Sequence, residues 1–352
     1  MPVISHPLAR FKTLCIAVAG VGAFQLLHWP LPFLFGPMSA LLLAALAGVS
    51  LKGVGPVSDA ARTILGVAIG ASITPALLAQ LPTMSITVAL VPVFVLLTGL
   101  MGVPYFRRVC GFDPVTSYYS AMPGGLQDMV LFGKEAGGRT RTISLIQATR
   151  LLAFVTIAPF VLSHYYGLSL FNPVGAALST MPRHELELML LTAALGWWLG
   201  KKVGLFGAPI LGPLILAAIA SLSGQLHLRP PQEAVWFAQL FVGIGIGVHY
   251  SGVTIKELRN DILKGLGFVV LLALLSASFI ATLTALGLGD PVSIFLAYAP
   301  AGQAEMAVFA IVVGADLGYV VAHHLVRIVL IIVGSPLAAG WLRRREAKAV
   351  PH

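Results

Sequence analysis

The sequence predicts an all-α polytopic membrane protein, built from two inverted repeats of about five spanning helices, each with one broken or re-entrant segment. Of its 352 residues, 58% are hydrophobic and only 10% are charged, whereas soluble domains carry about 25% charged residues. Rare polar residues recur along the chain at a constant spacing, which indicates an internal duplication. The basic residues cluster at the ends of apolar runs, as they do in the loops of membrane proteins.

A membrane-spanning helix needs about 20 mainly apolar residues, and such segments form two series in this chain. We expect repeat 1 over residues 1–165, a polar linker over 166–184, repeat 2 over 185–345 and a cytoplasmic tail over 346–352. The segments expected in repeat 1 are 13–29, 31–50, 57–80, 84–106, 115–137 and 140–165. Those expected in repeat 2 are 185–200, 207–226, 232–252, 262–287, 291–315 and 317–342.

The segments 115–137 and 291–315 are interrupted. Each begins at an Asp-Pro pair, has a proline near its middle with glycine one or two positions later, and carries an acidic residue five positions after that proline. Non-helical backbone is tolerated at membrane depth only where it is buried in protein or lines a wet cavity. A proline kink would explain one such break, but its recurrence together with an acid favours a site.

A shift of 177 residues relates the two series. It takes Asp113-Pro114 to Asp290-Pro291, Pro123-Gly124-Gly125 to Pro300-Ala301-Gly302, Asp128 to Glu305, Arg150 to Arg327, and Gly66 and Gly70 to Gly243 and Gly247. A constant offset across rare polar residues is strong evidence of duplication.

The distribution of Lys and Arg predicts the orientation. If both interrupted segments enter and leave on one side, 18 of the 22 basic residues share that side. Arg183 and Arg229 lie opposite, and Arg150 and Arg327 lie within the membrane. The positive-inside rule then places both termini in the cytoplasm. Each repeat has five crossings in this arrangement, so the two copies are inverted.

Inverted repeats with broken helices are the architecture of many secondary transporters, in which the helix ends at the breaks meet near the bilayer midplane and bind substrate or ion. We therefore expect the site at the two breaks and on the helix that follows each of them. The candidate residues are Pro123, Gly124, Gly125, Gln127, Asp128, Gln147, Arg150, Pro300, Gly302, Gln303, Glu305, His324 and Arg327.

Asp128 and Glu305 are buried-acid candidates, because carboxylates within membrane segments usually face the bundle interior and pair. Their expected partners are Arg150 and Arg327. Two roles stay open for these groups. One is a proton or ion relay through Asp128, Glu305 and His324, and the other is a pair of acid–arginine contacts that lock the repeats together.

Four motifs carry a family resemblance: GPM at 36–38, GVAIGAS at 66–72, MPGGLQDM at 122–129 and PAGQAEM at 300–306, followed by His324-x-x-Arg327. They resemble those of the AbrB-type duplicated membrane proteins, over nearly the whole chain. The resemblance implies a multi-pass protein of the bacterial inner membrane. Members of the family are labelled ammonia monooxygenases or membrane regulators of gene expression, and no catalytic residues are known to carry over.

Three functions are compatible with these observations. A transporter or permease for a small solute or ion comes first, because inverted repeats with broken helices are typical of secondary transporters. A membrane-embedded regulator comes second, and no nucleic-acid partner is expected, because no cytoplasmic stretch is long enough for a DNA-reading domain. A membrane monooxygenase comes third. It would need a metal, and the sequence offers no convincing ligand set, so we expect no metal, cofactor or catalytic residue, and a non-enzymatic role is favoured. The expected partners are the lipid bilayer and a small solute or ion.

Overall fold

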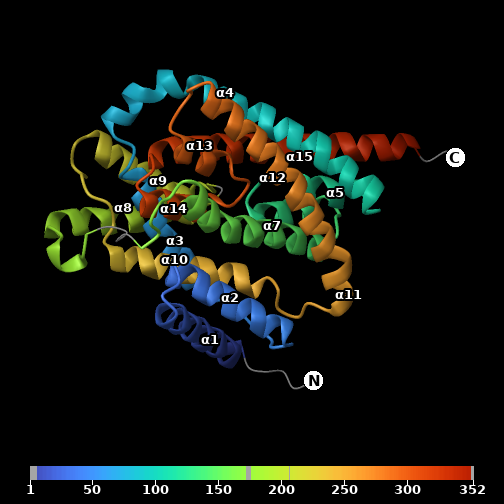
Figure 1. Ribbon diagram of the computed structural model, residues 1–352, viewed down its shortest axis with the longest axis horizontal. Helices are drawn as coiled ribbons and strands as arrows, with labels where there is room; N and C mark the ends of the chain where they lie inside the picture. The colour runs from blue at the N-terminus through green and yellow to red at the C-terminus, as the bar shows by residue number, and fades with distance from the viewer. Residues whose placement is uncertain (1–5, 172–175, 206, 350–352) are drawn as a thin grey trace. The chain divides into compact units, whose positions relative to one another are not determined.

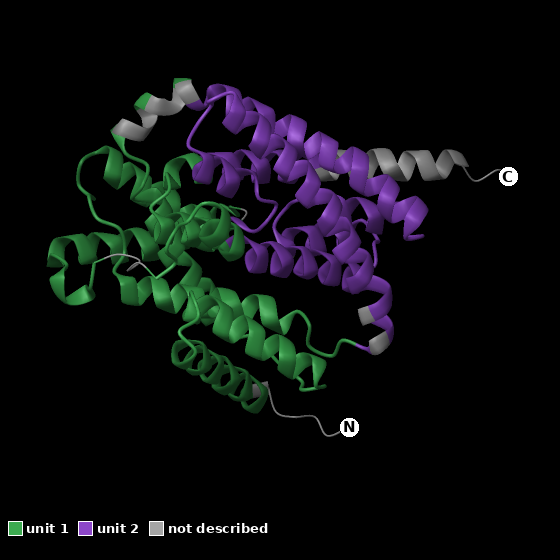
Figure 2. Cartoon of the chain, viewed as in Figure 1, with its two compact units in different colours: residues 1–82, 159–253, 304–321 green, residues 83–158, 254–303, 322–352 purple. Residues whose placement is uncertain are grey.

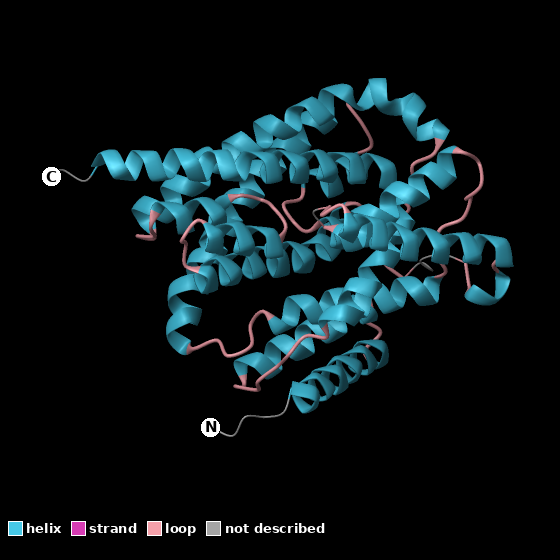
Figure 3. Cartoon of the chain, turned by 180° about the vertical axis from the view of Figure 1, so that it is seen from behind, coloured by secondary structure: helices cyan, strands magenta, loops and turns pink. Residues whose placement is uncertain are grey.

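The protein is all-helical, without strands, over residues 6–171, 176–205 and 207–349, which are the residues that the computed structural model describes (Figure 3). The elements of repeat 1 and the linker are α1 (His6–Leu26), α2 (Pro32–Leu46), α3 (Gly55–Gly70), α4 (Pro75–Pro104), η1 (Tyr105–Val109), α5 (Pro114–Ala121), α6 (Leu126–Glu135), α7 (Thr140–Phe160), η2 (Val161–Tyr165) and η3 (Leu178–Thr180). Those of repeat 2 are α8 (Arg183–Lys202), α9 (Ala208–Leu222), α10 (Gln232–Val248), α11 (Ile255–Glu257), η4 (Leu258–Ile262), α12 (Leu263–Ala285), α13 (Pro291–Tyr298), α14 (Gln303–Val313) and α15 (Leu317–Ala349).

In the described part of the chain, five helices are long and apolar enough to cross a membrane, which are features of a helical membrane protein. These segments are Pro7–Leu26, Met84–Val109, Thr140–Tyr165, Arg259–Ala285 and Leu317–Gly334. The other apolar helices have 10–17 residues. At about 1.5 Å per residue, a 15-residue helix such as α2 or α9 is roughly 22 Å long, less than the roughly 30 Å of a bilayer core.

Several expected segments have different bounds in the structure. The segments 31–50 and 207–226 are shorter than expected, because α2 and α9 end just before Gly48 (φ +82°) and Gly224 (φ +69°), whose left-handed backbone terminates a helix. The expected boundary near residues 80–84 is wrong. α3 ends at Gly70 instead, and α4 starts at Pro75, since a proline in the first turn loses no helical hydrogen bond.

The ends of repeat 2 also differ from the expectation. α8 begins at Arg183, within the expected linker, and the described part of α15 continues to Ala349, beyond the expected start of the tail at 346. Residues 172–175 of the linker and 350–352 of the tail lie outside the described residues.

The chain forms two compact units, and each takes elements from both repeats (Figure 2). Unit 1 comprises residues 1–82, 159–253 and 304–321, and unit 2 comprises residues 83–158, 254–303 and 322–352. The units therefore divide each repeat, with the first three helices of each copy in unit 1.

Unit 1 is built by exchange between the repeats. α1 packs on α2 and α8 packs on α9, so each copy contributes a helical pair (Figure 1). The third helix of each copy then packs on the pair of the other copy: α3 lies against α9, and α10 lies against α2. Because the two contacts are equivalent under the 177-residue repeat, they support the duplication independently of the motifs.

Glycines allow these helices to approach closely. A side chain at Gly66 of α3 would overlap the backbone carbonyl of Ile210 in α9, and one at Gly243 of α10 would overlap that of Leu34 in α2. Gly66 and Gly243 are therefore sites of close helix packing.

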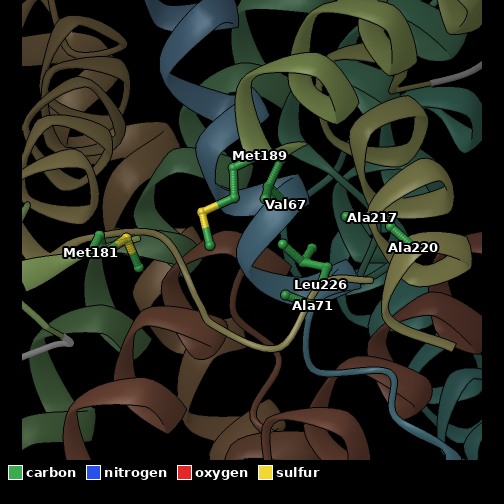
Figure 4. Close-up of a cluster of buried hydrophobic side chains, with 7 residues drawn as sticks. All are labelled: Val67, Ala71, Met181, Met189, Ala217, Ala220 and Leu226. Atoms are coloured by element: carbon green, nitrogen blue, oxygen red, sulfur yellow. The ribbon is translucent and has the colours of Figure 1, made fainter. Parts of the chain in front are cut away.

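A buried apolar cluster fills the space between α3, α8 and α9 in unit 1 (Figure 4). Its residues are Val67, Ala71, Met181, Met189, Ala217, Ala220 and Leu226. Beside it, the buried carboxylate of Glu185 on α8 accepts hydrogen bonds from the backbone N–H groups of His227 and Leu228, which ties the segment after α9 to α8.

Unit 2 contains the long helix α12, most of α4, α7 and α15, and both interruptions. Aromatic contacts join equivalent helices of the two repeats: Phe94 of α4 meets Phe279 of α12 with ring centroids 5.3 Å apart, and Phe106 of η1 meets Phe268 of α12 at 4.8 Å. Phe94, Phe106 and Phe268 are fully buried. Unit 2 thus has an aromatic core, and Tyr298 at the end of α13 belongs to it, with its ring centroid 5.6 Å from that of Phe94.

Candidate functional site

The first interruption lies between α5 and α6. α5 ends at Ala121 and α6 begins at Leu126, and the backbone between them is extended, with ψ 131° at Met122 and ψ 139° at Gly125. Pro123 explains the break, because a proline has no N–H to donate and disfavours helical backbone at the preceding residue.

The second interruption has the same construction. α13 ends at Tyr298, Ala299 is extended (ψ 125°), and α14 begins at Gln303 after Pro300. The predicted breaks in segments 115–137 and 291–315 are therefore confirmed. Pro300 is buried, as Pro123 is.

Each broken segment also begins in the same way. The Asp113 carboxylate accepts a hydrogen bond from the N–H of Thr116 (2.8 Å), and that of Asp290 accepts one from the N–H of Ser293 (2.8 Å), so both aspartates are helix N-caps. Partial burial acts to raise the pKa of Asp113. The hydrogen bonds from Thr116 and from the Arg139 guanidinium outweigh it, and the pKa of Asp113 lies below its ordinary value.

Two side chains of α7 hold the first break. The Arg150 guanidinium donates to the carbonyl of Met122 (3.1 Å) and to that of Gly124 (2.8 Å). The amide nitrogen of Gln147, one turn earlier, donates to the carbonyls of Tyr119 (2.6 Å) and Met122 (3.1 Å). Both side chains are buried, with Arg150 1% exposed. They satisfy carbonyl groups that the end of α5 leaves without helical partners.

Two side chains of α15 hold the second break at equivalent positions. The Arg327 guanidinium donates to the carbonyls of Ala299 (3.0 Å) and Ala301 (2.7 Å), which are the positions 177 residues after Met122 and Gly124. His324 takes the place of Gln147, and its Nε2 lies 2.9 Å from the carbonyl of Leu296. The repeat is thus preserved in individual hydrogen bonds as well as in helix order.

α15 contacts both breaks. Arg327 binds the second break, and Ile331, one turn further along α15, lies against the first: a Cβ added at Gly124 would lie 3.0 Å from its Cγ2. Positions four apart on a helix are about 6 Å apart along its axis. The expectation that the two breaks lie close together agrees with this shared neighbour.

The two acids occupy the first turn of the second half of each broken segment, Asp128 in α6 and Glu305 in α14. Negative charge is favourable there, because it faces the positive end of the helix dipole. A side chain at Gly125 would overlap the Asp128 carboxylate, so this carboxylate folds back over the break. The ion pairs expected between these acids and Arg150 and Arg327 stay predictions. Glu305 and Arg327 belong to different compact units, unit 1 and unit 2 respectively.

The surroundings of His324 define its protonation. A carbonyl can only accept, so the Nε2 atom that faces Leu296 carries the proton. A guanidinium can only donate, so the Nδ1 atom, 2.7 Å from Arg327 Nη2, presents its lone pair. A second proton on His324 would point at a buried cation. This arrangement favours a positioning role for His324 over the proton relay.

The same contacts bear on a metal site. Both ring nitrogens of His324 are engaged, so neither is available as a ligand beside His323. No group of three or more His, Cys, Asp or Glu side chains suited to a metal ion is found in the described part of the chain. The donor set does not fit the metal centre that a monooxygenase label implies.

The remaining predicted site residues lie at the same two places. Gly302 precedes α14, and Gln303 is its first residue and 9% exposed. Gln127 lies in the first turn of α6, and its side chain is outside the described part.

Some buried side-chain atoms at the breaks have no hydrogen-bond partner among the described residues. They include Ser120 Oγ, Gln147 Oε1, Gln303 Nε2 and Arg327 Nε. Buried polar groups are normally paired with protein or with ordered water. Sequence reasoning identified three of these residues but missed Ser120, because a serine in an apolar helix gives no signal of its own.

Comparisons with known proteins identify the family of this chain. Residues 33–343 match the family described as "Transition state regulatory protein AbrB". A protein of Bacillus subtilis (strain 168), "Uncharacterized protein YhjN", is 27% identical over 296 residues, which are 78% of this chain and 76% of the relative. A protein of Escherichia coli (strain K12), "Putative regulator AbrB", is 23% identical over 341 residues, which are 96% of this chain and 97% of the relative. With its family match covering most of its length, this duplicated chain belongs to the AbrB family.

Proposed function

We propose that this AbrB-family protein is a secondary transporter for a small polar solute in the bacterial inner membrane. The observation that carries the proposal is the pair of helix breaks in unit 2, each closed by a buried arginine and each with buried polar atoms left without a partner among the described residues. Broken helices of repeated units form the substrate sites of many secondary transporters.

The arginines allow such a site to exist. An interrupted helix within a membrane exposes backbone carbonyls, and each unsatisfied group costs several kcal/mol in a medium without water. Arg150 and Arg327 supply donors to those carbonyls from within the protein. The backbone is therefore stable without a ligand, and the unpartnered side-chain atoms remain available to one.

The proposal includes inverted repeats with both termini in the cytoplasm. It is based on the basic residues, of which 18 are expected on the side of the termini and two on the opposite side. Reporter domains fused to either terminus should therefore be active only as cytoplasmic reporters. A reporter inserted in the linker at residues 166–184 should be active only in the periplasm. A linker reporter on the same side as the termini would contradict the inverted arrangement.

Regulation is the second candidate, favoured by the name of the Escherichia coli relative, "Putative regulator AbrB". A regulator needs a partner to act on, whereas a transporter acts alone in a bilayer. Reconstitution of the purified protein therefore separates the two.

Uptake of a ¹³C-labelled small-molecule extract of bacterial cells into proteoliposomes, followed by mass spectrometry, tests the transport proposal. We expect at least one solute to accumulate above the level in empty vesicles. The Gln303→Leu variant should reduce its initial rate by roughly tenfold, as expected for one lost hydrogen bond to a polar or charged solute. The matched control is Gln225→Leu, at an exposed glutamine in unit 1, and it should transport normally. Accumulation of no solute by the wild-type protein would contradict the proposal.

A further inference from the structure

Basic side chains of unit 2 gather where two candidate membrane spans end. Arg107 and Arg108 lie in η1, at the end of one span, and Lys264 lies in the first turn of α12, near the start of another. Two hydrogen bonds tie these ends together. The Tyr105 hydroxyl donates to the carbonyl of Lys264 (2.9 Å), and the Lys264 ammonium donates to the carbonyl of Cys110 (2.9 Å). Cations from two spans therefore lie at the same end of unit 2.

An aromatic ring brings a further cation to this place. The Lys264 ammonium lies 4.9 Å from the centroid of the Phe112 ring, and the Arg139 guanidinium lies 4.8 Å from the same centroid. Phe112 is buried and stacks on Phe106 of η1, with ring centroids 5.6 Å apart. The ring is thus fixed in the protein and positions both cations. We call the four residues Arg107, Arg108, Arg139 and Lys264 the basic cluster.

The basic cluster has a surplus of positive charge. Asp113 pairs with Arg139 at 3.2 Å. The side chains of Arg107, Arg108 and Lys264 form no ion pair within the described part of the chain, and both arginines are exposed. Like charges held near one another repel, and a bound anion removes this cost. The cluster is therefore suited to an anionic ligand.

The helices that carry the cluster also expose apolar side chains. On α12 these recur at intervals of three or four residues, which places them on one face of the helix, and the first of them adjoins Lys264. On α4 they lie along the turns that precede η1. A ligand with an anionic head and apolar chains complements the cations and these faces together, whereas a free anion does not use the faces. The exposed residues are Leu263, Leu266, Val270 and Leu274 on α12, and Val93, Leu96 and Leu100 on α4.

We infer that the basic cluster binds the headgroup phosphate of an anionic phospholipid, whose chains lie along the exposed apolar faces of α4 and α12. Each Lys or Arg close to a membrane surface strengthens the binding of anionic lipid by about fivefold. The inference rests on the membrane location of the chain and not on transport, so it goes beyond the proposed function. Lipid binding is measured without any solute, and its failure is therefore distinguishable from a failure of transport.

The test is the thermal unfolding of the purified, delipidated protein in detergent with added phosphatidylglycerol. The comparisons are phosphatidylcholine with the same chains, and inorganic phosphate at matched ionic strength. We expect phosphatidylglycerol to raise the unfolding midpoint with a saturable concentration dependence, and the other two to leave it nearly unchanged.

Two double variants test the cluster itself. Arg107→Gln/Arg108→Gln removes two exposed charges without breaking a described ion pair, so it should remain folded and bind phosphatidylglycerol at least about tenfold more weakly. Arg107→Lys/Arg108→Lys keeps both charges and should bind nearly as the wild-type protein does. The matched control is Lys201→Gln/Lys202→Gln, which removes two adjacent exposed charges from the end of α8 in unit 1 and should leave the binding unchanged.

Other outcomes overturn the inference. Equal losses in the arginine and lysine glutamine variants would show a general attraction between a basic protein and an anionic lipid. Equal stabilisation by phosphatidylcholine would show that the charge of the headgroup is not recognised, and equal stabilisation by inorganic phosphate would show that the cluster binds a free anion. Failure of phosphatidylglycerol to stabilise a folded wild-type protein would contradict the lipid site directly.

Discussion

Replacing either buried arginine by methionine is expected to lower the stability of the protein far more than the same replacement of an exposed arginine. Arg150→Met leaves the carbonyls of Met122 and Gly124 without the donors that Arg150 supplies, and Arg327→Met does the same to Ala299 and Ala301. Each carbonyl left unpaired in a buried site costs about 1–3 kcal/mol, so each variant should lose roughly 2–6 kcal/mol. For a chain of 352 residues, the unfolding midpoint of the purified protein should then fall by about 3–8 °C.

The matched control is Arg141→Met. The Arg141 side chain is 42% exposed and pairs with Glu257 at 2.9 Å in unit 2. Exposed ion pairs contribute about 0–1 kcal/mol, so this variant should unfold close to the wild-type temperature. If Arg150→Met or Arg327→Met unfolded at the same temperature as Arg141→Met, the arginines would not hold the breaks together.

Thermal unfolding also separates the two roles open to the acids. If Asp128 is the ion partner of Arg150, then Asp128→Asn should also lower the midpoint, because it removes the counter-charge of a buried cation. If Asp128 acts in a relay, the variant should remain folded and lose transport. The contact between the Asp128 carboxylate and Gly125 shows only that the carboxylate lies at the break.

Much of the architecture was predictable from the sequence, because its signals are local. A proline interrupts a helix wherever it removes a donor and constrains the preceding residue, so the breaks at Pro123 and Pro300 could be located by inspection. The offset of 177 residues that relates Asp113 to Asp290 recurs as identical N-cap hydrogen bonds. The exchange of partners between the repeats, with α3 on α9 and α10 on α2, depends on packing and has no local signal.

The role of the arginines was only partly predictable. Sequence reasoning placed Arg150 and Arg327 at the breaks and assigned them acidic partners, because charged side chains in membranes usually pair. The contacts that the structure describes for these arginines go to backbone carbonyls, and the acidic partners stay predictions. Every residue carries a carbonyl, so the sequence cannot indicate which of them a helix break leaves exposed.

The close contact between α10 and α2 predicts a second large loss of stability, on replacement of Gly243 by alanine. Gly243→Ala would place a methyl group against the Leu34 carbonyl and the Pro37 ring, and both belong to a packed helix that cannot yield easily. Overpacking of this kind costs about 1–3 kcal/mol. Gly245→Ala lies on the same helix with no described atom within 4 Å of the added methyl group, so it is the matched control. It should be neutral or slightly stabilising, since alanine is the better helix former.

The repeat extends this prediction to the other copy. Gly66→Ala meets the carbonyl of Ile210 and the ring of Pro213 in the equivalent crossing of α3 on α9, so its loss of stability should resemble that of Gly243→Ala. The four proteins, including the wild type, can be compared by thermal unfolding in one detergent. Equal midpoints for Gly243→Ala and Gly245→Ala would contradict the close crossing. A strong effect of Gly243→Ala without one of Gly66→Ala would show that the two halves of unit 1 are not energetically equivalent, although their contacts are.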